Sequence, residues 1–433
     1  MRKNWKLPLS IKVASYRAKG RIDNIIAALL RTLPSVHKQL RIPAYRIKNI
    51  KDWVGKTRLK VIANKGMKLP SYSILYASLT SKPPAPKCPT DKYIPAYPTG
   101  LSQKKHYNYW DSRSGFDSRN GFYQKPSQQY DETFLVHILN GKILGPSGAV
   151  ITHDGGLMEQ SLWTWYDWIK KDRSQTAWRL PAPHQIAVPC YTVVSNYAEG
   201  YPHWLMEVLP RLYGLQTLPA SIKPTIIFNK ELNQWQKDSI RLLGFEDYPS
   251  IFLNDQYLAI DQLYVPSYVG MPGTPHPEGC KWVREKMLTN FKISESPIRV
   301  YISRRLATKR KLLNEEEILP VLKTFGFVEV MAENLSLAEQ VQLFGRAEAV
   351  VTPHGAGLGN LMFVPKGCKV LEILDRDYVN DHYYNLSGIL ELDYYYQLCN
   401  SINADTGKIL TPGWDHITID PEKLKISLKE MFP

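Results

Sequence analysis

The chain has 433 residues, 44% of them hydrophobic, which is enough for two or three domains of roughly 100–200 residues each. No apolar run reaches the roughly 18–20 residues of a membrane span, and the basic start lacks the apolar stretch and cleavage site of a signal peptide. The five cysteines are far apart and form no CxxC pair, which argues against a disulfide framework or a zinc ribbon and predicts a cytoplasmic protein.

The net charge of +15 is unevenly distributed along the chain. Residues 1–110 hold 23 Lys and Arg against 3 Asp and Glu, a net of +20, so residues 111–433 together carry −5. We therefore interpret residues 1–110 as a basic N-terminal extension and linker. Such an arm suits anionic lipid, an anionic polymer or nucleic acid. Residues 22–34 carry an apolar helical stripe that fits a membrane interface or a core helix.

Residues 111–287 have the pattern of a less regular α/β domain. Two apolar runs flank Asn140-Gly141, a dipeptide typical of β-hairpins. Strands are expected at residues 225–229 and up to residue 265, and helices at residues 235–245 and 280–291.

The segment NYAEGYPHWLMEVLPRL, residues 196–212, predicts a helix that begins after Pro202 and is broken at Pro210. His203 and Glu207 lie four residues apart on one helical face, where an imidazole and a carboxylate can share a proton-transfer task. Arg211 follows four residues later. An amphipathic helix with a capping histidine and a Glu207–Arg211 ion pair is the structural alternative.

Residues of the same segment could also contact the molecule that gives up its proton to this pair, which we call the acceptor. Trp204 and Arg211 are the candidate acceptor-side residues. Three more tryptophans, Trp163, Trp165 and Trp168, could stack against sugars or belong to a core.

Residues 288–400 alternate apolar strands with helices, which predicts a parallel sheet and a Rossmann-like domain. Residues 401–433 are expected to pack back on the body. In an open parallel sheet, ligands bind beyond the carboxyl ends of the strands. Two segments of this domain directly follow the carboxyl ends of predicted strands and are therefore candidate ligand-binding segments.

The first of them is the basic loop of residues 301–311, YISRRLATKRK. Arg304 and Arg305 lie at the end of a strand, and Arg310 follows between two lysines. Arginine forks suit phosphate oxygens, so the loop is a candidate site for a diphosphate. The alternative is a solvated basic loop.

The second segment is the glycine turn VVTPHGAGLGN, residues 350–360. His354, Gly355, Ala356, Gly357 and Asn360 follow an apolar strand and open an expected helix, whose free N–H groups favour an anion. A tight structural turn is the alternative. The spacing matches neither the dinucleotide fingerprint nor the P-loop.

Carboxylates follow the next strand. Asp375 and Asp377 form a D-x-D pair that could hold a nucleotide's cation, and Glu372 could accept ribose hydroxyls or be a buried paired carboxylate. The histidines show no zinc-binding spacing, and no GxSxG motif occurs.

Three segments in this order, NYAEGYPHWLMEVLPRL, YISRR with KRKLLNEEE, and VVTPHGAGLGNLMFVPKGCKVLEI, resemble glycosyltransferase family 61. That family includes capsular polysaccharide biosynthesis proteins, plant xylan transferases and the EGF-domain O-GlcNAc transferase. The resemblance covers residues 130–400. It implies a GT-B architecture, in which two Rossmann-like domains face a cleft, and inverting transfer from a nucleotide-diphosphate sugar without a metal.

The resemblance also implies roles for individual residues. Arg304 and Arg305 fall where the family's basic pair meets the diphosphate, and His354 to Asn360 fall on its glycine turn. His203 and Glu207 fall on its His-Trp segment.

Together these observations predict an α/β inverting glycosyltransferase that uses a UDP-linked sugar and a glycan or lipid-linked glycan acceptor in cell-surface polysaccharide synthesis. Either Glu207 or His203 is the base. Arg304, Arg305, Arg310, the glycine turn and Glu372 form the donor site. No cofactor, Mn²⁺ or Mg²⁺ is expected, and no nucleic acid, but the basic arm is expected to attach the enzyme to the inner face of the membrane.

Rival hypotheses remain. A non-catalytic nucleotide- or glycan-binding module with the same fold predicts binding without turnover. A nucleic-acid-binding protein predicts steep salt dependence. A metal-dependent transferase that uses Asp375 and Asp377 predicts inhibition by a chelator.

Overall fold

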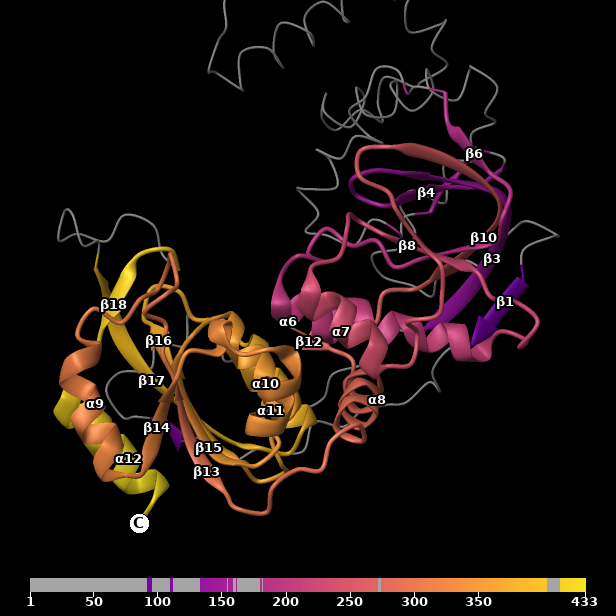
Figure 1. Ribbon diagram of the computed structural model, residues 1–433. Coiled ribbons are helices and arrows are strands. Elements are labelled where there is room, and N and C mark those ends of the chain that lie inside the picture. Colours follow the sequence, from indigo (N-terminus) through magenta and orange to yellow (C-terminus); the bar gives the residue numbers. More distant parts are fainter. Residues whose placement is uncertain are drawn as a thin grey trace, which may run out of the picture. The chain divides into compact units, whose positions relative to one another are not determined.

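The computed structural model describes residues 92–95, 110–111, 133–153, 155–158, 161, 180, 182–271, 274–402 and 413–433 (Figure 1). Except for Leu180, they all belong to one compact unit, which comprises residues 70–165 and 181–433. The expected helix of residues 22–34, nearly all of the basic extension and the tryptophans Trp163, Trp165 and Trp168 lie outside the described residues.

The first sheet is mixed rather than wholly parallel. The strands in its main path are β5 (Leu157–Met158), β4 (Ala149–Ile151), β3 (Phe134–Leu144), β10 (Tyr257–Pro266), β7 (Cys190–Thr192), β8 (Thr225–Phe228) and β9 (Ser250–Phe252), in that order. Strands β10, β7, β8 and β9 run parallel, whereas β3, β4 and β5 add antiparallel pairs. β1 (Lys92–Pro95) pairs with β3, and β6 (His184–Ile186) pairs with β10. Two short strands, β11 (Gly270–Met271) and β12 (Thr274–Pro275), form a separate ribbon.

The hairpin predicted at Asn140-Gly141 is wrong. Strand β3 runs straight through this dipeptide, and both Leu139 and Gly141 stay paired with β10. Asn140 does adopt a positive φ of 54°, as the motif favours. The long antiparallel partner β10 nevertheless holds both sides in one strand, so the chain turns only after Leu144, where residues 145–148 connect β3 to β4.

The helix predicted after residue 200 changes type twice. It begins as α6 (Tyr201–His203), widens to the π-helix η4 (Trp204–Val208) and tightens to the 3₁₀-helix η5 (Leu209–Thr217). The break at Pro210 is therefore confirmed, because the 3₁₀ segment begins with Pro210 in its first turn. Single π turns occur often at functional sites, and this one contains Glu207.

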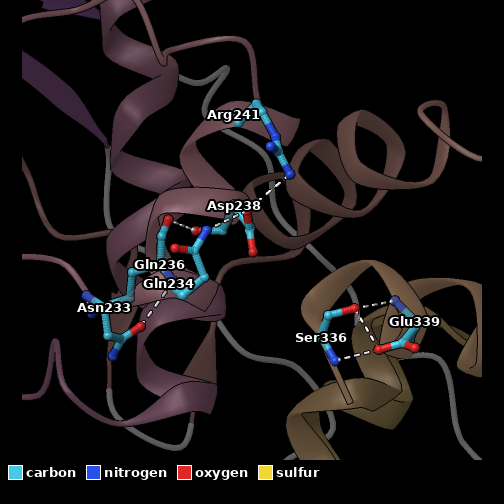
Figure 2. Close-up of polar contacts among 8 residues, drawn as sticks. Asn233, Gln234, Gln236, Asp238, Arg241, Ser336 and Glu339 are labelled. Carbon is cyan, nitrogen blue, oxygen red and sulfur yellow. Dashed lines mark hydrogen bonds and ion pairs between the residues drawn. The ribbon is translucent and has the colours of Figure 1, made fainter.

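Capping boxes begin two helices, of which one follows strand β8 of the first sheet and the other lies between strands of the second sheet. Asn233 and Gln236 exchange side chain–backbone hydrogen bonds at α7 (Gln234–Leu242), and Ser336 and Glu339 do so at α10 (Leu337–Phe344), as Figure 2 shows. Such reciprocal bonds satisfy N–H groups that have no partner within the helix. Between the two sheets in sequence lies α8 (Pro277–Leu288), which begins with Pro277.

The second sheet is the parallel sheet that the sequence predicts. Its order is β14 (Phe327–Val330), β13 (Ile298–Ile302), β15 (Ala347–Pro353), β16 (Lys369–Asp375), β17 (Asp393–Ile402) and β18 (His416–Thr418). All neighbours are parallel except β18, and β2 (Trp110–Asp111) also pairs with β17.

Helices cover both faces of this sheet (Figure 1). On one face, α9 (Glu315–Thr324) and α12 (Pro421–Met431) pack on Ala349, Val351 and Leu371. On the other, α10 and α11 (His382–Ile389) pack on Val350 and Val370. The remaining short elements are the 3₁₀-helices η6 (Ala332–Asn334) and η7 (Ala356–Met362).

The strand order places a topological switch point between β13 and β15. The chain runs from β13 outward to β14, then back past β13 to β15, β16 and β17. In open α/β sheets, the crevice at the carboxyl end of such a switch point is where ligands bind. Arg304 follows β13 and Gly355 follows β15, so both predicted phosphate-binding segments lie at this position.

Candidate active site

His203 and Glu207 form a hydrogen-bonded pair. Nδ1 of His203 lies 2.7 Å from Oε1 of Glu207. The His203 side chain is 26% exposed, whereas that of Glu207 is only 2% exposed. When Glu207 is ionised it can only accept, so the shared proton then lies on Nδ1 and Nε2 of His203 keeps its lone pair. The imidazole is therefore the member of the pair that can reach a substrate.

The Glu207 carboxyl is otherwise held in an apolar environment. Its Oε2 atom is buried and has no hydrogen-bond partner among the described residues. Burial raises the pKa of Glu207, and the hydrogen bond and charge of His203 oppose that rise. A buried carboxylate with a raised pKa beside a part-exposed imidazole makes this pair a candidate catalytic site.

Arg304 lies directly against Gly355 at the switch point. A Cβ atom at position 355 would overlap Nη1 of Arg304, so only glycine permits this approach. Nε and Nη2 of Arg304 donate to the carbonyl oxygens of Arg310 and Lys309, at 3.1 and 2.8 Å. No hydrogen bond of Nη1 occurs within the described part of the chain, which leaves this N–H group free to donate to an anion.

Arg304 remains a cation despite its burial. The residue is 9% exposed, and burial together with the neighbouring Arg310 lowers its pKa to about 10. Arg310 is held by the carbonyls of His354 and Gly413, to which it donates from Nε and Nη1. Two positive charges are thus kept side by side, an arrangement that a bound dianion stabilises.

His354 is oriented by a chain of buried polar groups. Its Nδ1 lies 2.5 Å from Oε1 of Glu372, and the hydroxyl of Tyr394 donates to Oε2 of the same carboxylate at 2.5 Å. Glu372 is fully buried. It is therefore the buried paired carboxylate of the two predicted alternatives, and it acts on a ligand only through His354.

The structure brings the His203 segment and the glycine turn together. The Tyr201 hydroxyl donates to Oδ1 of Asn360 at 2.8 Å, and a Cβ at Gly359 would lie 3.0 Å from the Tyr201 ring. Nδ2 of Asn360 donates to Gln340. Asn360 thus helps to hold α6 against η7, and its contact with a ligand stays a prediction.

His382, the first residue of α11, joins the two groups and was missed by the sequence analysis. Its ring centroid lies 5.6 Å from that of His203, and burial, followed by the nearby His203 and His354, lowers its pKa. It stacks on Tyr383, whose ring is 5.5 Å from that of His354. The signal available in the sequence was a histidine at the start of the helix after β16, at the edge of the sheet where ligands bind.

Several predicted site residues have structural roles. Arg305 pairs with Glu315, Glu316 and Glu329 instead of facing Gly355. Trp204 is buried in the core and donates from Nε1 to Ser239, so it cannot meet an acceptor.

Arg211 also differs from the prediction. It is buried and donates to the backbone carbonyls of Val194, Thr192 and Pro266, with its guanidinium over the Tyr268 ring. It stabilises the end of the first sheet's strands and pairs with no carboxylate in the described residues.

The helix expected after the glycine turn is only the seven-residue 3₁₀-helix η7. Its dipole is small, so phosphate binding there has to depend on Arg304 and Arg310. Ala356 is exposed and Gly357 is half-buried. Their amides precede the first hydrogen bond of the turn, from Leu358 to Gly355, and so are free to support a bound anion.

Asp375 of the D-x-D pair has backbone partners. The carboxylate of Asp375 is buried and accepts from the backbone N–H groups of Asp377 and Gly413, at 2.9 and 3.3 Å. Within the described residues, no three His, Cys, Asp or Glu side chains cluster in a way that could hold a metal ion.

The pairing of Arg305 leads to a prediction. Arg305→Ala should leave nucleotide binding unchanged and lower the free energy of unfolding by no more than about 1 kcal/mol, because the Arg305 side chain is 47% exposed and such ion pairs are screened. Urea denaturation and UDP titration of the variant test this. Loss of UDP binding with unchanged stability would show that Arg305 leaves its carboxylates to meet the ligand.

Comparison with known proteins identifies a matching family over this part of the chain. Residues 201–371 match the family model described as Glycosyltransferase 61, and this range contains His203, Glu207, Arg304 and His354.

An 84-residue segment is similar to the EGF domain-specific O-linked N-acetylglucosamine transferases of Gallus gallus (33% identical), Canis lupus familiaris (32%) and Mus musculus (31%). That segment covers 18% of this chain and 16% of each relative. Both comparisons agree with the family resemblance of the three sequence segments. Residues 201–371 therefore form a glycosyltransferase domain of family 61.

Proposed function

We propose that this protein is an inverting glycosyltransferase that moves a sugar from a nucleotide-diphosphate sugar to a hydroxyl of a glycan or lipid-linked glycan. One observation carries the proposal. The His203–Glu207 pair and the Arg304–Gly355 switch point, which follow strands of different sheets, are joined through the contact of α6 with η7, and the His382 ring lies beside that of His203. A base and a diphosphate site on neighbouring elements are the two parts that an inverting transfer needs. The two sheets would then be the two domains of a GT-B enzyme.

The donor side depends on positive charge. Nη1 of Arg304 and the cation of Arg310 would bind the diphosphate and stabilise the charge that develops on it as the bond to the sugar breaks. The proposal assigns the neutralisation of the diphosphate to these two arginines and uses no metal ion at the D-x-D pair.

On the acceptor side, His203 is the base and Glu207 is its positioning residue. Nε2 of His203 would take the proton of the acceptor hydroxyl while the hydroxyl oxygen forms a bond to the anomeric carbon. The bond from that carbon to the diphosphate oxygen breaks on the opposite face, so the nucleotide diphosphate leaves and the configuration inverts. Glu207 stabilises the imidazolium that forms, as the carboxylate of a catalytic triad does.

The matched relatives suggest which substrates to test first. Their names state that they transfer N-acetylglucosamine to EGF domains, so UDP-GlcNAc is the first donor. We propose a glycan or lipid-linked acceptor in cell-surface polysaccharide synthesis, with the basic N-terminal residues near anionic lipid. Among the described helices, none is long and apolar enough to cross a membrane. Incubation with UDP-GlcNAc and an acceptor panel, followed by NMR of the product's anomeric configuration, tests the reaction; a product of retained configuration would contradict it.

The nucleotide can be identified by a thermal-shift panel of UDP, GDP, CDP and ADP, with EDTA or with Mn²⁺. We expect UDP at 100 times its Kd to stabilise the folded state by about 2.7 kcal/mol, equally in EDTA. A Tm shift that appears only with Mn²⁺ would contradict metal independence. If no diphosphate shifts the Tm, the donor site is not at Arg304 and Gly355.

A further inference from the structure

His382 is a buried histidine whose packing leaves one ring nitrogen without a partner in the described part of the chain. It is 7% exposed, and its Nε2 is buried without a hydrogen-bond partner among the described residues. An unsatisfied buried polar atom costs about 1–3 kcal/mol, so a leucine would fill the same space at lower cost. Such a group in a native structure usually has a partner that arrives with a ligand.

Its neighbours indicate where that ligand lies. The His382 ring is 5.6 Å from the ring of His203, the proposed base, and it stacks at 5.1 Å on Tyr383, which in turn contacts His354 of the glycine turn. His382 therefore lies between the base and the diphosphate site. When a sugar moves from the diphosphate to an acceptor hydroxyl at that base, the sugar lies between the two groups, next to His382.

The charge state of His382 agrees with that placement. Burial, and then the nearby His203 and His354, lower the pKa of His382 to about 3. The imidazole is neutral at any physiological pH, so it does not repel the positive charge that develops on a sugar ring during transfer. A neutral imidazole also offers one donor and one acceptor, which matches a hydroxyl group, whereas the arginines of the site offer only donors.

We propose that His382 binds a hydroxyl group of the transferred sugar and thereby helps to select the donor. This inference rests on the proposed function. It assigns His382 to the sugar, and not to the nucleotide or to the acceptor. Substitution of His382 should therefore weaken the binding of UDP-sugars and leave the binding of UDP unchanged.

The test compares dissociation constants for UDP, UDP-GlcNAc, UDP-glucose and UDP-xylose on the full chain. We expect wild type to bind at least one UDP-sugar more tightly than UDP. In His382→Leu, the Kd for that UDP-sugar should rise about tenfold, whereas the Kd for UDP should stay unchanged. His382→Gln, whose amide nitrogen can reach the position of Nε2, should recover part of the lost affinity. His184→Ala, an exposed histidine substitution on β6, should behave as wild type.

Stability gives an independent readout. His382→Leu should raise the Tm, because it removes the unsatisfied nitrogen, whereas a histidine with a structural role would lose stability on this change. If His382→Leu kept the full sugar-dependent gain in affinity, the proposed role of His382 would be wrong. The same would follow if wild type bound UDP but bound no UDP-sugar more tightly. Neither result would contradict the proposed donor site. If wild type bound neither UDP nor any UDP-sugar, the proposed donor site itself would be wrong, and this inference with it.

Discussion

His203→Ala should lower kcat for sugar transfer by about 10²–10⁴-fold, the range that a general base contributes, and leave UDP affinity unchanged. The reason is geometric. Nε2 is the only ring nitrogen of His203 that is not directed at Glu207, and the residue is part-exposed while its partner is buried. Single-turnover measurements with UDP-GlcNAc and parallel UDP titrations separate the two effects. An equal loss of UDP binding would instead assign His203 to the donor site.

Glu207→Gln provides the matched test of the pair. The amide oxygen can still accept from Nδ1, so the imidazole keeps its orientation and loses only the negative charge. We expect a fall in kcat of about 10- to 100-fold, as for other residues that orient a functional histidine. If Glu207→Gln fell as far as His203→Ala while Glu207→Asp retained activity, Glu207 itself would be the base.

The pH dependence of the pair follows from the buried carboxyl. Because the pKa of Glu207 is raised, the folded state binds more protons than the unfolded state above pH 4.5, and wild-type stability falls as pH rises through this range. Glu207→Gln should therefore gain stability relative to wild type as pH increases. Activity should fall on the acidic side at a pH above 4.5, since protonated Glu207 would donate to Nδ1. Thermal melts and kcat/KM profiles across pH check both expectations.

Gly355→Ala should abolish detectable UDP binding and lower kcat/KM by about 10²–10³-fold, the cost of losing one donor to a developing anion. A methyl group there would occupy the position of Nη1 of Arg304 and force the guanidinium out of the switch point. The φ of Gly355 is 170°, an extended value that alanine tolerates, so backbone strain does not contribute. Arg304→Ala should have the same effect.

Gly357→Ala is the control in the same turn. Its Cβ would lie 3.1 Å from Cγ2 of Ile302, a contact that a small shift relieves, and no arginine is displaced. We expect UDP binding close to wild type. Equal losses in both glycine variants would mean that the turn's shape, rather than Arg304, holds the nucleotide. Full activity of Gly355→Ala would remove Arg304 from the mechanism.

Much of the second sheet could be predicted because its strands are buried on both faces. Buried parallel strands are continuous apolar runs separated by helices, and this pattern is local. The carboxyl ends of β13 and β15 could therefore be located from residues 298–305 and 349–357 alone. The hairpin expected at Asn140-Gly141 failed because strand pairing with β10, more than 100 residues away, overrode a two-residue turn preference.

The roles of adjacent residues could not be predicted in the same way. Arg304 and Arg305 are equivalent in sequence, yet Arg304 lies against Gly355 while Arg305 meets carboxylates, including those in the first turn of α9. The direction of each side chain depends on where the chain leaves the strand, and its partner comes from a distant segment.

The amino-acid sequence by itself indicated the resemblance to glycosyltransferase family 61, the parallel sheet, the position of the glycine turn and the His203–Glu207 spacing, because each is a local pattern of residue types. Only the tertiary structure decided that Nη1 of Arg304 has no hydrogen bond among the described residues, that Asn360, Arg211 and Trp204 bond to other parts of the protein, and that the His382 ring lies beside that of His203. These depend on contacts between different elements of the fold, where burial and hydrogen-bond partners, rather than residue type, set the role of a side chain.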